Sequence, residues 1–353
     1  MDSIVTPSYD IHFDQKAYDE LNNHLKQTNY SKIFILVDEN THQHCLPRFM
    51  AELRRDVDAE IIEMEAGEIH KNIETCTQIW HALSELDADR RSLLINLGGG
   101  VVTDLGGFVA ATFNRGIDFI NAPTSLLAMV DASVGGKTGV DLGMLKNQIG
   151  VFSQPLMVLV ISEFLETLDE RQLRSGFAEM LKHGIIEDHT YWNSLKGLTK
   201  LEKLDPFIYR SIGIKNDVVQ QDPNEHNLRK ILNFGHTLGH AIESYFLEKD
   251  PDTALLHGEA IAAGMVLEAF LSAKLCGLGP NQLADIKNTL LERYKKVPFS
   301  QEDIEGILAL MKFDKKSSHG LVNFVLIKRI GEALIDQRVP YNLFEEAFAY
   351  YKE

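Results

Sequence analysis

Cysteine is scarce in this chain of 353 residues, and its three copies, Cys45, Cys76 and Cys276, lie far apart. No pair has the C-x-x-C spacing of a redox or zinc motif, and an odd number of scattered cysteines argues against a disulfide scaffold. We therefore expect a protein of a reducing compartment, the cytoplasm.

Long apolar runs and excess positive charge are also missing. No stretch approaches the roughly 18 apolar residues of a membrane span, and the start, MDSIVTPSYDIHFDQ, lacks the pattern of a signal peptide. The chain has 35 Lys and Arg against 51 Asp and Glu, a formal net charge of −16. This balance argues against nucleic acid and anionic membranes as partners. A small anionic substrate would need a local cluster of basic residues.

The first 160 residues alternate between two kinds of segment. Short apolar runs predict strands at 31–39, 59–67, 91–100, 117–125 and 154–161. Helical periodicity predicts helices at 44–55, with Pro47 in the first turn, at 72–88 and at 106–116. Strict alternation of strand and helix is typical of βαβ units and a parallel sheet.

After residue 162 helical periodicity dominates, apart from a hairpin expected at 320–336. We therefore predict two domains. Residues 1–162 would form an α/β, Rossmann-like nucleotide-binding domain, and residues 163–353 a mainly α-helical domain that binds metal and substrate. The active site is expected in the cleft between them.

Glycines mark a candidate nucleotide site. The stretch LGGGVVTDLGG (97–107) follows a predicted strand and opens a helix, where backbone amides and the helix dipole favour a pyrophosphate. The stretch is not G-x-G-x-x-G, and a tight turn needed only for packing is the alternative. Asp38 ends the first strand, where it could bind an adenosine ribose or simply be a solvated acid.

Histidines mark a candidate metal site. His236 and His240 share one helix face at i and i+4, and His257 follows on the next predicted helix. Glu179 lies among small and apolar residues, where a buried carboxylate needs a cation. Spacing favours His236 and His240 as joint zinc ligands and leaves His257 or Glu179 as the third, with His183, four residues after Glu179, as a weaker candidate. A core histidine that only forms hydrogen bonds is nevertheless the commoner case.

Six motifs, in order along the chain, resemble the 3-dehydroquinate synthase family between about residues 34 and 336. They are GGGVVTDLGGFVAATFNRGI, PTSLLAMVDASVGGKTGVDLGMLKNQIGVFSQP, SGFAEMLKHG, RKILNFGHTLGHAIE, HGEAIAAGM and DKKSSHGLVNFVLIKRIG. The resemblance implies NAD and a divalent metal, zinc or alternatively cobalt. It also replaces the ligand set favoured by spacing with Glu179, His236 and His257, and makes His240 a residue that handles substrate and protons.

The same resemblance implies the other contacts. Nucleotide contacts fall on Asp38, Asn40, Glu68, Lys71, Gly99, Gly100, Val101, Asp104, Thr124, Ser125, Leu127, Lys137 and Lys146. Substrate contacts fall on Asp131, Lys137, Asn147, Lys182, Lys215, Arg229, Asn233 and one of Lys315 and Lys316. Lys137 and Lys146 lie in what reads as a glycine-rich loop. Arg115 resembles an arginine that reaches the phosphate bound by a neighbouring subunit, which implies a homodimer.

The implied reaction converts 3-deoxy-D-arabino-heptulosonate 7-phosphate, a small sugar phosphate, to 3-dehydroquinate and phosphate, with NAD as a catalyst. Rival interpretations are a sister cyclase acting on sedoheptulose 7-phosphate, a metal-dependent polyol dehydrogenase, and a non-catalytic scaffold that binds zinc and nucleotide. A carboxylate-bearing substrate is favoured by Arg229 and Lys215, and the basic, glycine-rich stretch around Lys137 argues against the dehydrogenase.

Overall fold

The computed structural model describes the whole chain except residues 144, 251–253 and 314–321. The chain divides into two compact units, each formed from two segments. The first unit is Met1–Leu173 with Leu204–Asn216, and the second is Arg174–Lys203 with Asp217–Glu353. Two of the three divisions fall inside helices, α6 (Glu170–Ile186) and α8 (Asp205–Gln221), and the third immediately precedes α8.

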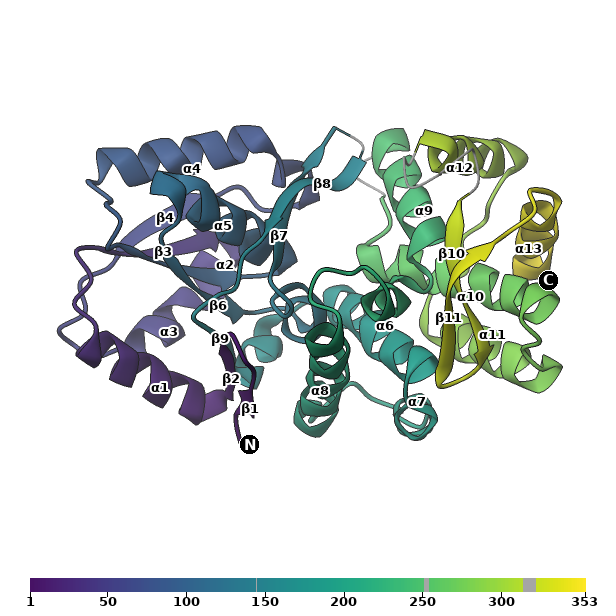
Figure 1. The fold of residues 1–353 in the computed structure, drawn as a ribbon, viewed down its shortest axis with the longest axis horizontal. Coiled ribbons are helices and arrows are strands. Elements are labelled where there is room, and N and C mark those ends of the chain that lie inside the picture. The colour runs from purple at the N-terminus through teal and green to yellow at the C-terminus, as the bar shows by residue number, and fades with distance from the viewer. Residues whose placement is uncertain (144, 251–253, 314–321) are drawn as a thin grey trace. The chain divides into compact units, whose positions relative to one another are not determined.

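A seven-stranded sheet forms the centre of the first unit (Figure 1). In spatial order its strands are β1 (Ile4–Val5), β2 (Asp10–Phe13), β9 (Met157–Val160), β6 (Asp118–Pro123), β5 (Leu93–Gly98), β3 (Ile33–Asp38) and β4 (Glu60–Met64). All neighbours are parallel except the short edge strand β1, which is antiparallel to β2. The predicted parallel sheet is therefore confirmed, with each predicted strand present.

Helices cover both faces of this sheet, which explains why β5 is buried along its whole length. On one face α4 (Ile73–Glu85) and α5 (Gly100–Thr112) pack on β3, β4 and β5 through an apolar core that includes Phe34, Leu94 and Leu105. On the other face lie α1 (Asp14–Gln27) and α3 (Leu46–Glu52), with the short α2 (Glu39–His44) after β3 (Figure 1). Pro47 lies in the first turn of α3, as predicted.

Two predictions from the sequence differ from the structure in this unit. Helix α5 begins at Gly100, not near residue 106. Gly106 therefore lies inside the helix. A Cβ at this position would stand 2.0 Å from Oδ1 of Asn96 on β5, so glycine is needed here for the close packing of helix on sheet. The segment 133–150 is not a loop, because β7 (Lys137–Leu142) and β8 (Leu145–Phe152) pair there as an antiparallel hairpin.

Short helical turns complete the first unit. These are η1 (Glu68–His70), η2 (Phe113–Arg115), the single π turn η3 (Ala128–Ala132) and η4 (Ser162–Thr167).

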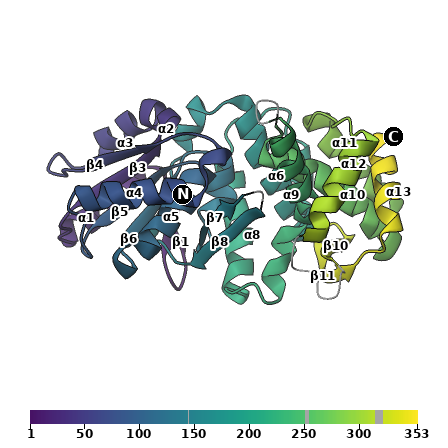
Figure 2. The ribbon, with the colours of Figure 1, turned by 90° about the horizontal axis from the view of Figure 1, so that it is seen from above.

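The second unit is mainly helical, as predicted. Besides the ends of α6 and α8 it contains α7 (His189–Lys196), η5 (Leu228–Asn233), α9 (His236–Lys249), α10 (His257–Leu275), α11 (Pro280–Arg293), α12 (Gln301–Phe313) and α13 (Asn342–Lys352). The expected hairpin is present as β10 (Asn323–Arg329) and β11 (Glu332–Arg338). Helix α10 is the central helix, buried on nearly every side, and α9, α11, α13 and β10 pack around it (Figures 1 and 2).

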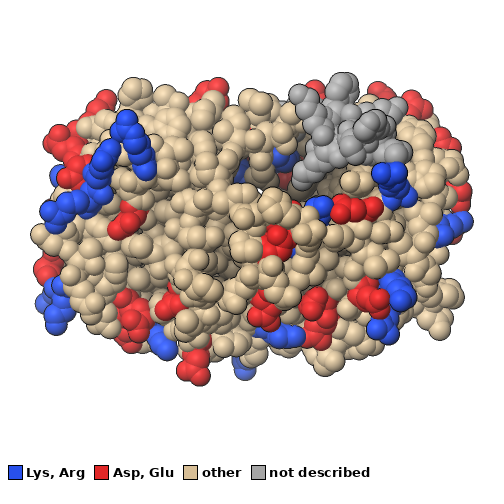
Figure 3. All heavy atoms as spheres, in the orientation of Figure 1, with Lys and Arg blue, Asp and Glu red and all other residues tan. Residues whose placement is uncertain are grey.

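Charged side chains of both signs are interspersed on the face drawn in Figure 3, without a broad basic field among its described residues. Of the helices in the described part of the chain, none has the length and apolar character needed to cross a bilayer.

Candidate active site

The order of strands in the first unit creates a crossover point between β3 and β5. The chain moves from β3 to its outer neighbour β4 and then returns to the other side of β3 as β5. In open parallel sheets, ligands bind beyond the carboxyl ends of the strands at such a point. Asp38 ends β3, and Gly99 and Gly100 follow β5, so these predicted nucleotide residues lie at that edge.

The start of α5 has the geometry expected of an anion site. Gly99 is the N-cap and Gly100 the first helical residue, so the amide end of the helix faces this edge. The neighbouring strand β6 ends beside it, since the Thr124 amide donates to the Gly98 carbonyl at 2.9 Å. A Cβ on Gly99 would stand 3.5 Å from the Ser125 hydroxyl. Predicted residues from two strand ends therefore meet here.

Asp38 also has a structural role that the sequence analysis did not weigh. Its Oδ1 accepts the Thr41 amide at 2.8 Å, and the Thr41 hydroxyl contacts the Asp38 backbone amide at 2.9 Å. This reciprocal pair is a capping box for α2. The contacts hold Asp38 at the strand end, while Asn40 lies exposed in the first turn of the same helix.

A buried ionic network joins other predicted ligand residues of the first unit. The Lys71 ammonium donates to Asp104 Oδ2 at 2.6 Å and to Asn147 Oδ1 at 2.8 Å. Lys146 pairs with Glu68 Oε1 at 2.7 Å. Burial opposes the charge on Lys71, but the surrounding carboxylates outweigh it and raise its pKa, so the lysine stays protonated.

The remaining predicted residues of the first unit are spread over several elements. Asp131 in η3 forms an ion pair with the Lys215 ammonium, and the Lys215 side chain is nearly buried. Lys137 is exposed at the first residue of β7. Val101 belongs to the first turn of α5, and Leu127 precedes η3. Arg115 is exposed in η2 with a left-handed φ of 69°.

Three predicted metal ligands meet in the second unit. Glu179, fully buried on α6, has the Nε2 atoms of both His236 and His257 at 3.5 Å from its Oε1. His236 is the first residue of α9, and His257 is the first residue of α10. Two imidazole nitrogens and a carboxylate oxygen are a common catalytic ligand set for zinc, and they suit related divalent metals. These residues therefore fit a metal ion.

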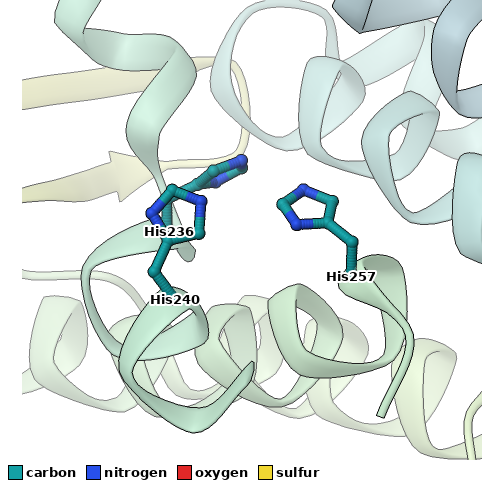
Figure 4. Close-up of side chains that lie close together, drawn as sticks. All are labelled: His236, His240 and His257. Carbon is teal, nitrogen blue, oxygen red and sulfur yellow. The ribbon is translucent and has the colours of Figure 1, made fainter. Parts of the chain in front are cut away.

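His240 lies beside the same group. Figure 4 shows the rings of His236 and His240, one turn apart on α9, together with His257 at the start of α10. Each pair of ring centroids is 5.1 to 5.7 Å apart, and ligand atoms of the three residues lie within 4.8 Å of one another. The arrangement brings together His236, His240 and His257, whereas His183, the weaker candidate, is buried on α6.

The surroundings give two of these imidazoles opposite proton affinities. Burial, together with the Lys182 ammonium, lowers the pKa of His236 well below its ordinary value, so its ring is neutral. Burial acts in the same direction on His257, but Glu243 and Glu179 outweigh it and raise its pKa to about 10. Glu243 Oε2 lies 3.0 Å from His257 Nδ1, which leaves Nε2 facing Glu179.

A second buried acid, Glu268 on α10, holds the start of α9. Its Oε2 accepts the Gly235 amide at 2.6 Å and its Oε1 accepts the Leu238 amide at 3.2 Å. These donors belong to the first turn of the helix that carries His236 and His240, and its N-cap, Gly235, offers no side chain. Glu268 therefore replaces a local cap with a contact from the neighbouring helix.

The predicted substrate residues of the second unit differ in their hydrogen-bond and ion-pair partners. Lys182, one turn after Glu179 on α6, is buried and contacts its carboxylate. Arg229 in η5 is buried and donates to the Pro223 carbonyl at 2.7 Å. The Asn233 amide donates to Glu225 Oε1 at 2.7 Å. Lys315 and Lys316 lie outside the described residues.

Four acidic residues carry contacts at these sites that were not predicted from the sequence. They are Glu243, Glu268, Glu225 and Asp141. Glu243 follows His240 by three residues, so helical spacing could have flagged it as a neighbour. No local pattern marks Glu268, because its partners are backbone amides about thirty residues away in the chain.

Comparison with known proteins gives matches along most of the chain. The family models for the N-terminal and C-terminal parts of 3-dehydroquinate synthase match residues 61–175 and 176–317. The 3-dehydroquinate synthase of Parabacteroides distasonis is 43% identical over 339 residues, which cover 95% of each chain. That of Clostridium beijerinckii is 40% identical over 313 residues, covering 87% of this chain and 88% of the other.

Solved structures show the same fold at lower identity. The 2-epi-5-epi-valiolone synthase of Streptomyces hygroscopicus, with NAD+ and Zn2+ bound, has a TM-score of 0.85 at 24% identity and covers 100% of this chain and 99% of its own. A 2-deoxy-scyllo-inosose synthase in complex with carbaglucose-6-phosphate, NAD+ and Co2+ has a TM-score of 0.81 at 22% identity, with 98% of each chain covered. Glycerol dehydrogenase of Schizosaccharomyces pombe is more distant, with a TM-score of 0.66 at 13% identity and coverage of 99% and 90%.

Proposed function

The chain belongs to the 3-dehydroquinate synthase family, and from this premise we propose that it converts 3-deoxy-D-arabino-heptulosonate 7-phosphate to 3-dehydroquinate and phosphate. The observation that carries the proposal is the convergence of His236 and His257 on the buried carboxylate of Glu179. A purely structural histidine would need one hydrogen-bond partner, whereas two imidazoles aimed at one carboxylate suit a shared metal ion.

We assign Glu179, His236 and His257 as the ligands of a divalent metal, zinc or cobalt. When bound, such an ion supplies Lewis-acid polarisation of substrate hydroxyls. The protein's contribution is the geometry: Glu243 orients His257, and Glu268 fixes the start of the helix that carries His236. Lys182 balances part of the carboxylate charge beside the site.

NAD is proposed to bind at the carboxyl edge of the parallel sheet, with its phosphates at the start of α5. When bound, it supplies reversible hydride transfer and is regenerated within each turnover. The glycines after β5 let the nucleotide approach the helix amides, and Lys71, Lys146 and their carboxylate partners form the adjoining polar wall.

The substrate carries a carboxylate and a phosphate, so its recognition needs cations. Lys137, Lys182, Lys215 and Arg229 are proposed to hold these groups by charge-assisted hydrogen bonds, with Asp131 and Asn233 orienting hydroxyls. Lys215 and Arg229 are buried and already hydrogen-bonded, which fixes their positions before substrate arrives. His240, next to the metal ligands, is proposed to move protons to and from substrate oxygens.

We also propose that the protein works in the cytoplasm as a homodimer in which Arg115 reaches the phosphate bound by the other subunit. Arg115 is exposed and held in an unusual left-handed conformation by a tight turn that ends in Gly116. Mixing an Arg115→Ala protein with a second inactive variant, such as His240→Ala, tests the arrangement. Subunit exchange should restore part of the activity. In the mixed dimer, the site that keeps His240 receives Arg115 from the other subunit and is therefore intact.

The decisive assay uses zinc-loaded protein with a trace of NAD. Heptulosonate 7-phosphate and sedoheptulose 7-phosphate are offered separately, and phosphate release and carbocycle formation are followed. Many turnovers per NAD with the first sugar alone support the proposal. Turnover with the second sugar alone would assign the protein to the sister cyclases. One NADH per site without phosphate release would identify a dehydrogenase.

A further inference from the structure

The β7–β8 hairpin is irregular at one position. Val140 pairs with Ile149 and Leu142 pairs with Leu145, so that Asp141 alone on β7 faces three residues on β8. Such a bulge changes the direction of the side chains on the longer strand, and bulges are enriched next to active sites. The three residues are Lys146, Asn147 and Gln148. Two of them are predicted ligand contacts.

Asp141 holds the backbone of this bulge. Its Oδ1 accepts the Asn147 amide at 2.7 Å. Asn147 has a left-handed φ of 53°, a conformation that residues with a Cβ seldom adopt, although asparagine tolerates it better than most. The hydrogen bond that the Asn147 amide donates to the Asp141 carboxylate stabilises this conformation.

Asp141 also joins the bulge to two other parts of the polar network. Its Oδ2 lies 3.3 Å from the Lys146 ammonium, and its backbone amide donates to the Lys71 carbonyl at 2.9 Å. The side chain is 11% exposed, and that of Lys146 8%. The Lys71 ammonium in turn donates to Asn147 Oδ1. Asp141 therefore contacts Lys71, Lys146 and Asn147, and a hydrogen bond also joins Lys71 to Asn147.

We propose that Asp141 is a positioning residue, whose carboxylate sets the bulge that aims Lys146 toward the nucleotide and Asn147 toward the substrate. The inference deepens the proposed function and rests on it for the identity of the ligands. Asp141 itself touches neither ligand in this scheme. It acts through Lys146, Asn147 and the backbone of the segment that carries Lys71.

Two substitutions separate the hydrogen bond from the charge. Asp141→Asn keeps an oxygen that can accept the Asn147 amide but removes the charge facing Lys146, whereas Asp141→Ala removes both. Asp336→Ala is the matched control, because Asp336 also lies in a hairpin with a left-handed φ of 56° and pairs with a lysine, Lys230, at 3.0 Å. Metal-loaded full-length protein is used throughout.

Three readouts are compared: the Kd for NAD by calorimetry, kcat and KM for the sugar phosphate, and amide hydrogen exchange of residues 145–152. Asp141→Ala should weaken NAD binding about ten-fold, raise the substrate KM by a similar factor and speed exchange in 145–152. Asp141→Asn should leave exchange close to wild type and weaken NAD by about three-fold. Asp336→Ala should match wild type in all three.

Several outcomes would overturn the inference. One is that Asp141→Ala keeps the wild-type NAD affinity and exchange rates. Another is that Asp141→Asn exchanges as fast as Asp141→Ala, which would remove the role of the hydrogen bond. If Asp141→Ala does not fold, Asp141→Asn decides: unchanged NAD affinity counts against the proposal. If the wild-type protein binds NAD but shows no turnover, the proposed function is refuted but the role of Asp141 is not. The NAD affinity and the hydrogen exchange of the variants still test that role. Wild-type protein that binds no NAD would refute the ligand role.

Discussion

At the scale of single residues, three chemically identical side chains acquire different properties from their neighbours. His236 is kept neutral by burial and by Lys182, whereas Glu243 and Glu179 favour the proton on His257. His240 is only partly buried and lies one turn further along α9. A side chain's role at this site therefore depends on which carboxylate or ammonium it contacts.

The proposed metal set is tested by comparing two histidines. His257→Ala should lower metal affinity by more than about 100-fold and abolish activity, since losing a ligand costs more than losing its hydrogen-bond partner. His240→Ala should bind metal normally but reduce kcat by about 10²- to 10⁴-fold, the usual effect of a lost acid or base. Metal content by mass spectrometry and steady-state rates give the result. Metal loss in His240→Ala with retention in His257→Ala would contradict the assignment.

Glu243 is expected to act on the metal through His257. Glu243→Gln keeps the size of the side chain but weakens the hydrogen bond that presents Nε2 of His257. The metal Kd should rise by about 10- to 100-fold, as for other carboxylates that orient a histidine ligand. Competition with a chelating dye measures it. Glu248, a helix turn or so beyond on α9, provides a control, and Glu248→Gln should leave the Kd unchanged.

At the scale of elements, the approach of α9 to α10 depends on glycine. Gly235 has a φ of +79°, and a Cβ there would stand 2.4 Å from Met265 Cγ on α10. A Cβ on Gly264 would stand 2.1 Å from the Gly235 carbonyl oxygen. The two helices therefore touch through backbone, which brings His236 and His257 to the same carboxylate.

Gly235→Ala should destabilise the protein by about 2–4 kcal/mol, from the left-handed backbone and the overlap with Met265. Gly213→Ala is the control, because Gly213 lies within α8 and, in the described part of the chain, no atom beyond its neighbours and its own helix backbone stands within 4 Å of the place of its Cβ. That change should be neutral or stabilise by up to about 1 kcal/mol. Urea unfolding measures both. Equal effects of the two substitutions on the free energy of unfolding would show that the close helix contact at Gly235 does not require glycine.

Asp303 connects the start of α12 to α9 and makes stability depend on pH. Its carboxylate accepts the Ser300 amide at 2.8 Å, the Tyr245 hydroxyl at 3.0 Å and the Lys249 ammonium at 2.6 Å. Burial alone would raise the pKa of Asp303, but the three donors outweigh it and lower that pKa below its ordinary value. The stabilisation is therefore complete above the pKa of the unfolded aspartate and is lost as pH falls through the folded one.

Asp303→Asn should accordingly destabilise the protein by about 1–3 kcal/mol at pH 7. The difference from wild type should shrink as pH falls below about 4, where the aspartate of the unfolded wild-type chain begins to take up a proton while the folded carboxylate is still charged. Urea unfolding at pH 7, 5 and 3 follows this change. A difference that stays constant down to pH 3 would mean that the charge of Asp303 is not involved.

At the scale of the whole molecule, each compact unit carries its own predicted ligand set. Most of the nucleotide residues lie around β5, α5 and the β7–β8 hairpin of the first unit. All three proposed metal ligands lie in the second unit. Lys215, predicted as a substrate contact of the second domain, belongs to the first unit through α8.

This division predicts separate protection by the two ligands. Zinc without NAD should slow amide exchange at the start of α9 and α10, and NAD without zinc should slow it at the start of α5 and in residues 137–152. Exchange followed by mass spectrometry, with α13 as a remote reference, measures both effects. Protection of the α5 segment by zinc alone, or of α9 by NAD alone, would contradict the assignment of ligands to units.

Much of this protein could be predicted from local sequence. Apolar runs of strand length alternating with helical periodicity predicted the parallel sheet and the helical second half, because side-chain periodicity reports directly on which face is buried. The stretch 97–107 predicted a helix opening after a strand, although the helix itself was placed too late, at 106–116. Spacing brought His236 and His240 together and drew attention to His257, and the quoted motifs predicted the family, which the comparisons confirm.

Other features were decided only by tertiary structure. Glu179 and His257 are 78 positions apart, yet their side chains meet; Glu268 caps a helix start on a different element; and Asp141 sets a bulge across a hairpin that reads as a loop. Periodicity describes one element at a time, so it cannot say which of several acids will face a given imidazole or amide. That choice follows from how closely helices and strands pack, and here glycines at helix contacts and a carboxylate in a hairpin determine it.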